Sequence, residues 1–184
     1  AASDVYKRQE RTLELARERA VELGIRHVLV ASTSGKTGAR AAEVMRDLEV
    51  TVVSHSAGFS APNEQQLGPE YREAIEGCGA RILTTQHALG GVGRAIRRKL
   101  GTYQLDEIIA FVLRNFCEGV KVACEITVMA ADAGLVPAGE EIVAIGGTGS
   151  GADTAVVIRA ANAQDFFDLR VLEIICKPRQ ARLR

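Results

Sequence analysis

The chain of 184 residues has no tryptophan, 4% aromatic residues and no net charge. Its 23 basic and 23 acidic side chains balance, so it lacks the broad positive field of a nucleic-acid-binding protein. One local basic run, Arg94, Arg97, Arg98 and Lys99, is best interpreted as the solvated face of a helix. No stretch reaches the roughly 18 consecutive apolar residues that span a bilayer. We therefore expect neither a nucleic acid nor a membrane as a partner.

Cysteine and histidine are also scarce. None of the cysteines forms a CxxC pair, and no histidine stands at metal-ligand spacing. This pattern favours buried, reduced thiols in a cytoplasmic protein without a metal site. The four cysteines are Cys78, Cys117, Cys124 and Cys176.

The first nine residues lack both a signal-peptide pattern and helical periodicity. The string from Ser3 to Gln9 resembles translated adaptor sequence. We therefore expect residues 1–9 to be a non-native or disordered tail, and the true N-terminus to be missing. Residues 10–178 are expected to form a single domain, because that length suits one buried core.

Apolar periodicity predicts alternating strands and helices. Short apolar runs of this kind indicate parallel strands that are covered on both faces and joined by right-handed crossovers. We expect an α/β fold, a three-layer α/β/α sandwich with a mostly parallel sheet and an antiparallel C-terminal part. The expected strands span residues 27–31, 51–54, 81–84, 141–146, 155–158 and 171–176. The expected helices span residues 13–23, 41–48, 69–78, 105–116 and 120–133.

A hydroxyl-rich segment leaves the first expected strand and enters a helix. Ligands of parallel sheets gather at such strand ends, and the new helix offers unpaired N–H groups and a positive dipole end. A glycine allows close backbone approach, and a lysine supplies a full charge. The segment therefore predicts a phosphate-binding loop. Its residues are Ser32, Thr33, Ser34, Gly35, Lys36 and Thr37.

The sequence of this loop allows two other interpretations. The pattern is half of a Walker A motif, but Val30 stands where that motif needs glycine, and no strand ends in a magnesium-binding aspartate. Nucleotide hydrolysis is therefore disfavoured. A plain helix cap remains an alternative, although a cap needs only one hydroxyl group.

A second glycine-rich loop follows the fourth expected strand. Its glycines permit unusual φ angles and close approach to a ligand, and the alternative is a flexible hairpin between two strands. A strand rather than a helix follows, which argues against a dinucleotide fingerprint. The candidate contacts are Gly146, Gly147, Thr148, Gly149, Asp153 and Thr154.

In this order and context the two loops resemble those of the C-terminal α/β domain of pyruvate kinase. In that family a Thr-Lys-Ser-Gly-Arg-Ser loop holds a phosphate of fructose bisphosphate, and Ser32-Thr-Ser-Gly-Lys-Thr37 matches it here. The catalytic barrel has no counterpart in these residues, so we expect no kinase activity. The tryptophan and arginine of the family's second loop are missing, and the family's preceding arginine aligns near Ala133. These departures imply a ligand with one phosphate and a larger uncharged body.

The chain resembles more closely a family of small stand-alone pyruvate kinase α/β-domain-like proteins from archaea and bacteria. The resemblance implies a ligand of the flavin mononucleotide (FMN) type and no established reaction. Members begin with a further segment before the first helix. The matching segments are Ser32-Thr-Ser-Gly35, Ser54-His-Ser-Ala-Gly-Phe59, Lys121-Val-Ala-Cys-Glu-Ile126, Met129-Ala-Ala-Asp-Ala-Gly134 and Gly146-Gly-Thr-Gly149.

Further candidates lie on the expected ligand side of the sheet. His55, Gly58 and Phe59 follow the second strand and are candidates to contact a flavin ring, with ordinary loop residues as the alternative. His87 follows the third strand. Glu125 stands one turn after Lys121 on an apolar helix, where an i,i+4 ion pair is the simpler interpretation and a carboxylate facing the pocket the alternative.

Two functions follow as hypotheses. The chain is either an FMN-binding protein with a redox role or a non-catalytic sensor of a phosphorylated metabolite. The wide apolar stripe over residues 105–116 also leads us to expect a homo-oligomer.

Overall fold

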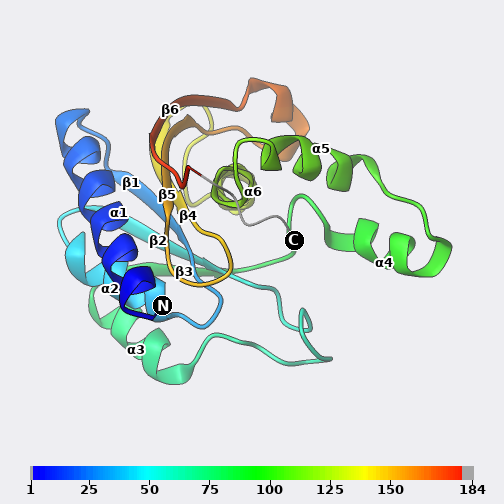
Figure 1. The fold of residues 1–184 in the computed structure, drawn as a ribbon, viewed down its shortest axis with the longest axis horizontal. Coiled ribbons are helices and arrows are strands. Elements are labelled where there is room, and N and C mark those ends of the chain that lie inside the picture. The colour runs from blue at the N-terminus through cyan, green and yellow to red at the C-terminus, as the bar shows by residue number, and fades with distance from the viewer. Residues whose placement is uncertain (1, 180–184) are drawn as a thin grey trace.

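The computed structural model describes residues 2–179. A central sheet of six strands forms the middle layer of the fold (Figure 1). The strand order is β3-β2-β1-β4-β5-β6. Strands β3, β2, β1 and β4 run parallel to one another, whereas β5 pairs antiparallel with both β4 and β6. The predicted sheet is therefore confirmed. The strands are β1 (His27–Ala31), β2 (Glu49–Ser54), β3 (Arg81–Thr84), β4 (Glu141–Gly146), β5 (Thr154–Arg159) and β6 (Arg170–Cys176).

Helices cover both faces of this sheet (Figure 1). Side chains of β1 alternate between the faces, so that Val28 and Val30 pack with the first layer of helices and Leu29 packs with the second. The first layer holds α1 (Ala2–Glu22), α2 (Lys36–Val44) and α3 (Pro69–Gly77). The second holds α6 (Glu118–Asp132), with α5 (Leu105–Arg114) and the 3₁₀ helix η1 (Ala163–Asp168) against it. Burial on both faces explains why the strands are continuous apolar runs.

The helix α4 (Gly91–Leu100) lies away from the sheet (Figure 1) and buries none of its residues. The apolar stripe on the next helix, α5, faces outward. Leu105, Ile108 and Val112 are between 48% and 79% exposed, whereas Glu107 and Ala110 are the buried residues of α5.

Residues 2–9 continue α1, so they do not form a disordered tail, and that they are non-native stays a prediction. Gln9 is buried, and its Oε1 accepts a hydrogen bond of 2.9 Å from the Thr37 hydroxyl. Polar Gln9 and Thr12 lie in line with Leu13 and Ala16 on the buried face, which hides the helical pattern from a hydrophobicity count. Residue 1 lies outside the described residues.

The cysteines are all free, but only Cys117 and Cys124 are buried as expected. Cys78 and Cys176 are half-buried, so the expectation is wrong for these two. Burial raises the pKa of the Cys124 thiol to about 12, which makes it unreactive.

None of the helices within residues 2–179 is both long and apolar enough to span a bilayer.

Candidate functional site

The loops that follow β1, β2, β3 and β4 leave the sheet at one edge, because these strands are parallel. Ala31 pairs with Val53, Ser54 with Thr84, and the neighbouring β1 residue Val30 with Ile145. This is the edge at which parallel sheets bind ligands. It brings together the loops that carry the predicted site residues.

In the β1–α2 loop, two of the predicted hydroxyl groups form hydrogen bonds that hold the loop to the helices α1 and α2. The buried Ser32 Oγ accepts the N–H of Gly38 at 3.1 Å and so caps the first turn of α2. The Thr37 hydroxyl donates to Gln9 on α1. The capping interpretation therefore accounts for Ser32, and packing against α1 accounts for Thr37.

The remaining polar groups of the loop are exposed at the start of α2. Thr33, Ser34 and Lys36 are exposed, and α2 begins at Lys36. Gly35 has a φ of 95°, in the left-handed region that favours glycine. A Cβ atom on Gly35 would lie 2.5 Å from both Leu67 Cδ1 and Tyr71 Cβ. Two hydroxyls, a cation and a helix N-terminus thus share one exposed turn, a combination that suits an anion.

A cluster of rings lies beside this turn, on the loops after β2 and β3. The centroids of the His55 and Phe59 rings are 4.1 Å apart, and the His87 ring lies 5.0 Å and 4.9 Å from them. Arg94 on α4 places its Cζ 5.0 Å from the centre of the Phe59 ring. We call His55, Phe59 and His87 the ring cluster. Burial lowers the pKa of His87 to about 4, so this imidazole is neutral at pH 7.

His55 connects the ring cluster to the β1–α2 loop. Its Nε2 lies 3.3 Å from the Thr33 hydroxyl, and its Nδ1 lies 2.8 Å from the amide oxygen of Gln66. This pattern fits a ring that donates from Nδ1 and accepts from Thr33 at Nε2. Gly58, with a φ of 82°, makes the turn that precedes Phe59.

The glycine-rich loop closes a hairpin, because Gly146 at the end of β4 pairs with Thr154 at the start of β5. A Cβ atom on Gly147 would lie 2.1 Å from the Gly151 carbonyl oxygen, so the loop itself fills that space. Asp153 accepts hydrogen bonds from the Thr154 hydroxyl at 2.7 Å and the Thr148 N–H at 3.2 Å. The hairpin therefore explains most of the residue choices in this loop.

Turn closure also explains Gly149, which takes a φ of 81° at the exposed tip of the hairpin, but it leaves one feature of the loop unexplained. The Thr148 Oγ1 is buried and has no hydrogen-bond partner among the described residues. An unpaired buried hydroxyl costs free energy, so this atom is a candidate to meet a ligand.

Lys121 and Glu125 form the predicted i,i+4 ion pair, and both side chains are buried, at 4% and 3% exposed. The other carboxylate oxygen of Glu125 accepts the Leu89 N–H at 3.0 Å. The pair therefore fastens the loop after β3 to α6. The simpler interpretation of Glu125 is confirmed by this geometry.

Sequence reasoning missed three partners of the predicted residues. Gln9 lies in the expected tail, and Gln66 lies in a polar loop where the sequence gives it no distinct signal. Arg94 was interpreted as part of a solvated helix face, but it lies against Phe59. Its neighbour Arg97 is likewise paired, with Glu107 at 2.7 Å. Arg94 lies far along the chain from Phe59 and gives no local signal, because the contact depends on how α4 folds back toward the loop after β2.

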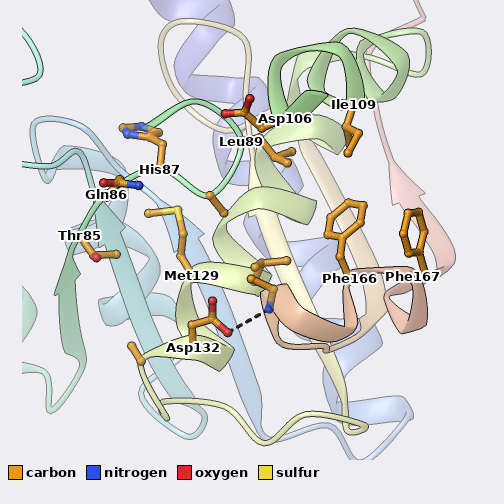
Figure 2. A pocket seen from close by; sticks show the side chains of 14 residues that line it. Thr85, Gln86, His87, Leu89, Asp106, Ile109, Met129, Asp132, Phe166 and Phe167 are labelled. Carbon is orange, nitrogen blue, oxygen red and sulfur yellow. Dashed lines mark hydrogen bonds between the residues drawn. The ribbon is translucent and has the colours of Figure 1, made fainter. Parts of the chain in front are cut away.

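A pocket of about 540 Å³ lies over α6 (Figure 2), and among the candidates named above only His87 lines it. Within residues 2–179, no three His, Cys, Asp or Glu side chains are grouped as a metal site requires.

Comparison with known proteins relates this chain to a protein family. The model of the family described as "Pyruvate kinase, alpha/beta domain" matches residues 10–158. Among solved structures, a pyruvate kinase from Cryptosporidium parvum is similar over 83% of this chain, at 12% identity and a TM-score of 0.44. The chain covers 23% of that enzyme's length.

Proposed function

The chain belongs to the pyruvate kinase alpha/beta domain family, and from this premise we propose that it binds a phosphorylated small molecule at the β1–α2 loop. The observation that carries the proposal is the exposed turn at Thr33, Ser34 and Lys36. These residues present two hydroxyls and a cation at the N-terminus of α2, while Ser32 and Thr37 hold the turn in place. Such a turn binds a phosphate through charge and N–H donors together.

FMN is the ligand that the surrounding residues fit best. The ring cluster offers a flat aromatic surface next to the phosphate turn, because His55 contacts Thr33 directly. Arg94 adds a second cation at that surface. The buried Thr148 hydroxyl would find an acceptor in a ligand oxygen.

A second phosphate has little support at the glycine-rich loop. The residues from Gly146 to Gly151 include no basic side chain, and Asp153 is engaged within the loop. A bisphosphate would therefore meet a carboxylate and a neutral hydroxyl where it needs cations. One phosphate and a larger ring body suit the site better.

The first test is the colour of the purified protein. Bound flavin gives absorption bands near about 370 and 450 nm, which belong to the cofactor and not to the chain. We expect a yellow protein, or a colourless one that becomes yellow and keeps the colour through gel filtration after incubation with FMN. Protein that stays colourless after that treatment would refute FMN as the ligand and leave the phosphate turn open to other esters.

A non-catalytic sensor of a sugar phosphate is the second candidate. It is favoured by the ion pair of Lys121 with Glu125, because each of these two buried groups, which act on His87, is already bound to the other. A ligand that binds only the folded state raises the melting temperature. A rise with sugar phosphates and none with FMN would support the sensor over the flavoprotein.

A further inference from the structure

The pocket over α6 is separate from the phosphate turn and is built from four segments. Its floor is formed by α6, and its sides are formed by α5, by η1 and by the loop after β3 (Figure 2). The volume of about 540 Å³ lies within the range of small-molecule sites. None of the residues proposed to hold the phosphate lines it.

The centre of the pocket is apolar. Figure 2 shows Leu89, Ile109 and Phe166 directed from three sides toward the same space, with Met129 at the other end of the pocket, near Gln86 and His87. Leu89 is held in place because its N–H is bonded to Glu125. An aromatic face, a thioether and two branched side chains suit a flat ring rather than a sugar.

The charges around the pocket are of one sign. No lysine or arginine lines it, whereas Asp106 and Asp132 do. Asp132 is engaged, because its Oδ1 accepts hydrogen bonds of 3.0 Å from Asn162 Nδ2 and the Ala163 N–H. Asp106 has no hydrogen-bond or ion-pair partner among the described residues. His87, the one imidazole in the lining, is neutral at pH 7.

We propose that this pocket binds a small flat aromatic compound that carries an ammonium or N–H group toward Asp106. The apolar centre takes the ring, and the unpaired carboxylate at the rim takes the donor. An anionic ring compound is disfavoured, because two carboxylates and no lysine or arginine line the pocket. The pocket therefore selects against the phosphate esters proposed for the β1–α2 loop, and the two sites take different ligands.

Three probes that share the indole ring and differ in charge test the proposal on the full chain. Tryptamine is a cation, indole is neutral and indole-3-acetate is an anion at pH 7. We expect binding to fall in that order by isothermal titration, and the amide signals of residues 85–89, 106–109 and 163–167 to shift in NMR spectra. Equal affinity for the three probes, a preference for the anion, or no binding by any of them would overturn the proposal.

Two pairs of variants locate the ring and the charge. Asp106→Asn is expected to remove most of tryptamine's advantage over indole, which is roughly two- to fivefold for a partly exposed ion pair. Asp165→Asn, an exposed change on η1, should leave it unaltered. Phe166→Ala is expected to weaken all binding about tenfold or more through lost ring contact, and Phe111→Ala on the outer side of α5 should not. Wild-type affinity in Asp106→Asn or Phe166→Ala contradicts the assignment.

One further variant tests whether this pocket and the phosphate turn are separate sites. Lys36→Ala should leave tryptamine binding unchanged, because Lys36 does not line the pocket. Loss of tryptamine binding in Lys36→Ala would mean that the pocket and the phosphate turn are one site. Melting temperatures of all variants, measured without ligand, separate lost binding from lost folding.

Discussion

The Ser32 hydroxyl accepts the Gly38 N–H at 3.1 Å, whereas the next hydroxyl along the chain, on Thr33, is exposed and reaches His55. One caps α2 and the other faces the proposed ligand. Ser32→Ala should therefore lower the free energy of unfolding by about 1 kcal/mol, as loss of a cap does. Thr33→Ala should change it by less than about 0.5 kcal/mol and instead weaken phosphate-ester binding. Urea unfolding and ligand titration measure both; equal destabilisation by the two changes would contradict the division.

Gly35 has a φ of 95° and no room for a side chain, since a Cβ would lie 2.5 Å from Leu67 and Tyr71. Gly35→Ala should destabilise the fold by about 2–4 kcal/mol, the sum of left-handed strain and overpacking. Gly24 is the matched control, because its φ is 68° but nothing lies within 4 Å of a Cβ. Gly24→Ala should cost about 1 kcal/mol. Similar losses of unfolding free energy at the two positions would show that the packing of Leu67 and Tyr71 against Gly35 is unimportant.

The Lys121–Glu125 pair is buried, so removing one member leaves a charge without compensation. Glu125→Leu should cost about 3–5 kcal/mol. The double variant Lys121→Met with Glu125→Leu should cost less than the sum of the single changes. The exposed Arg72–Glu76 pair has the same spacing, and Glu76→Gln should change stability by less than about 0.5 kcal/mol. If the double variant loses as much unfolding free energy as the two single variants together, Lys121 and Glu125 do not depend on each other.

Burial lowers the pKa of His87 from 6.5 to about 4. The unfolded chain therefore takes up a proton between pH 6.5 and pH 4 that the folded chain does not, and stability falls as the pH is lowered through this window. His87→Phe should keep the ring contacts and remove this part of the loss. Urea unfolding of both proteins at pH 7.5, 6, 5 and 4.5 tests this. Their stability difference should be constant above about pH 7 and shift in favour of His87→Phe below it; parallel curves would contradict the assignment.

The layered fold was predictable because buried strands are continuous apolar runs and helices carry stripes. The start of α1 was not, because Gln9 and Thr12 are polar residues on its buried face. Nor did the hydroxyl pattern of the β1–α2 loop reveal which groups face a ligand. That division depends on Gln9, 28 residues before Thr37. The pocket over α6 was missed because its four segments meet only in the folded chain.

The affinity of FMN compared with that of riboflavin, in the wild type and in Lys36→Ala, tests the phosphate turn most directly. The two ligands differ only in the phosphate, so their difference reports contacts at that group. The account predicts that the wild type binds FMN at least about tenfold more tightly than riboflavin, as loss of charge-assisted hydrogen bonds implies. In Lys36→Ala the two affinities should approach each other while riboflavin binding stays unchanged. Equal affinities in the wild type, or an undiminished preference for FMN in Lys36→Ala, would contradict it.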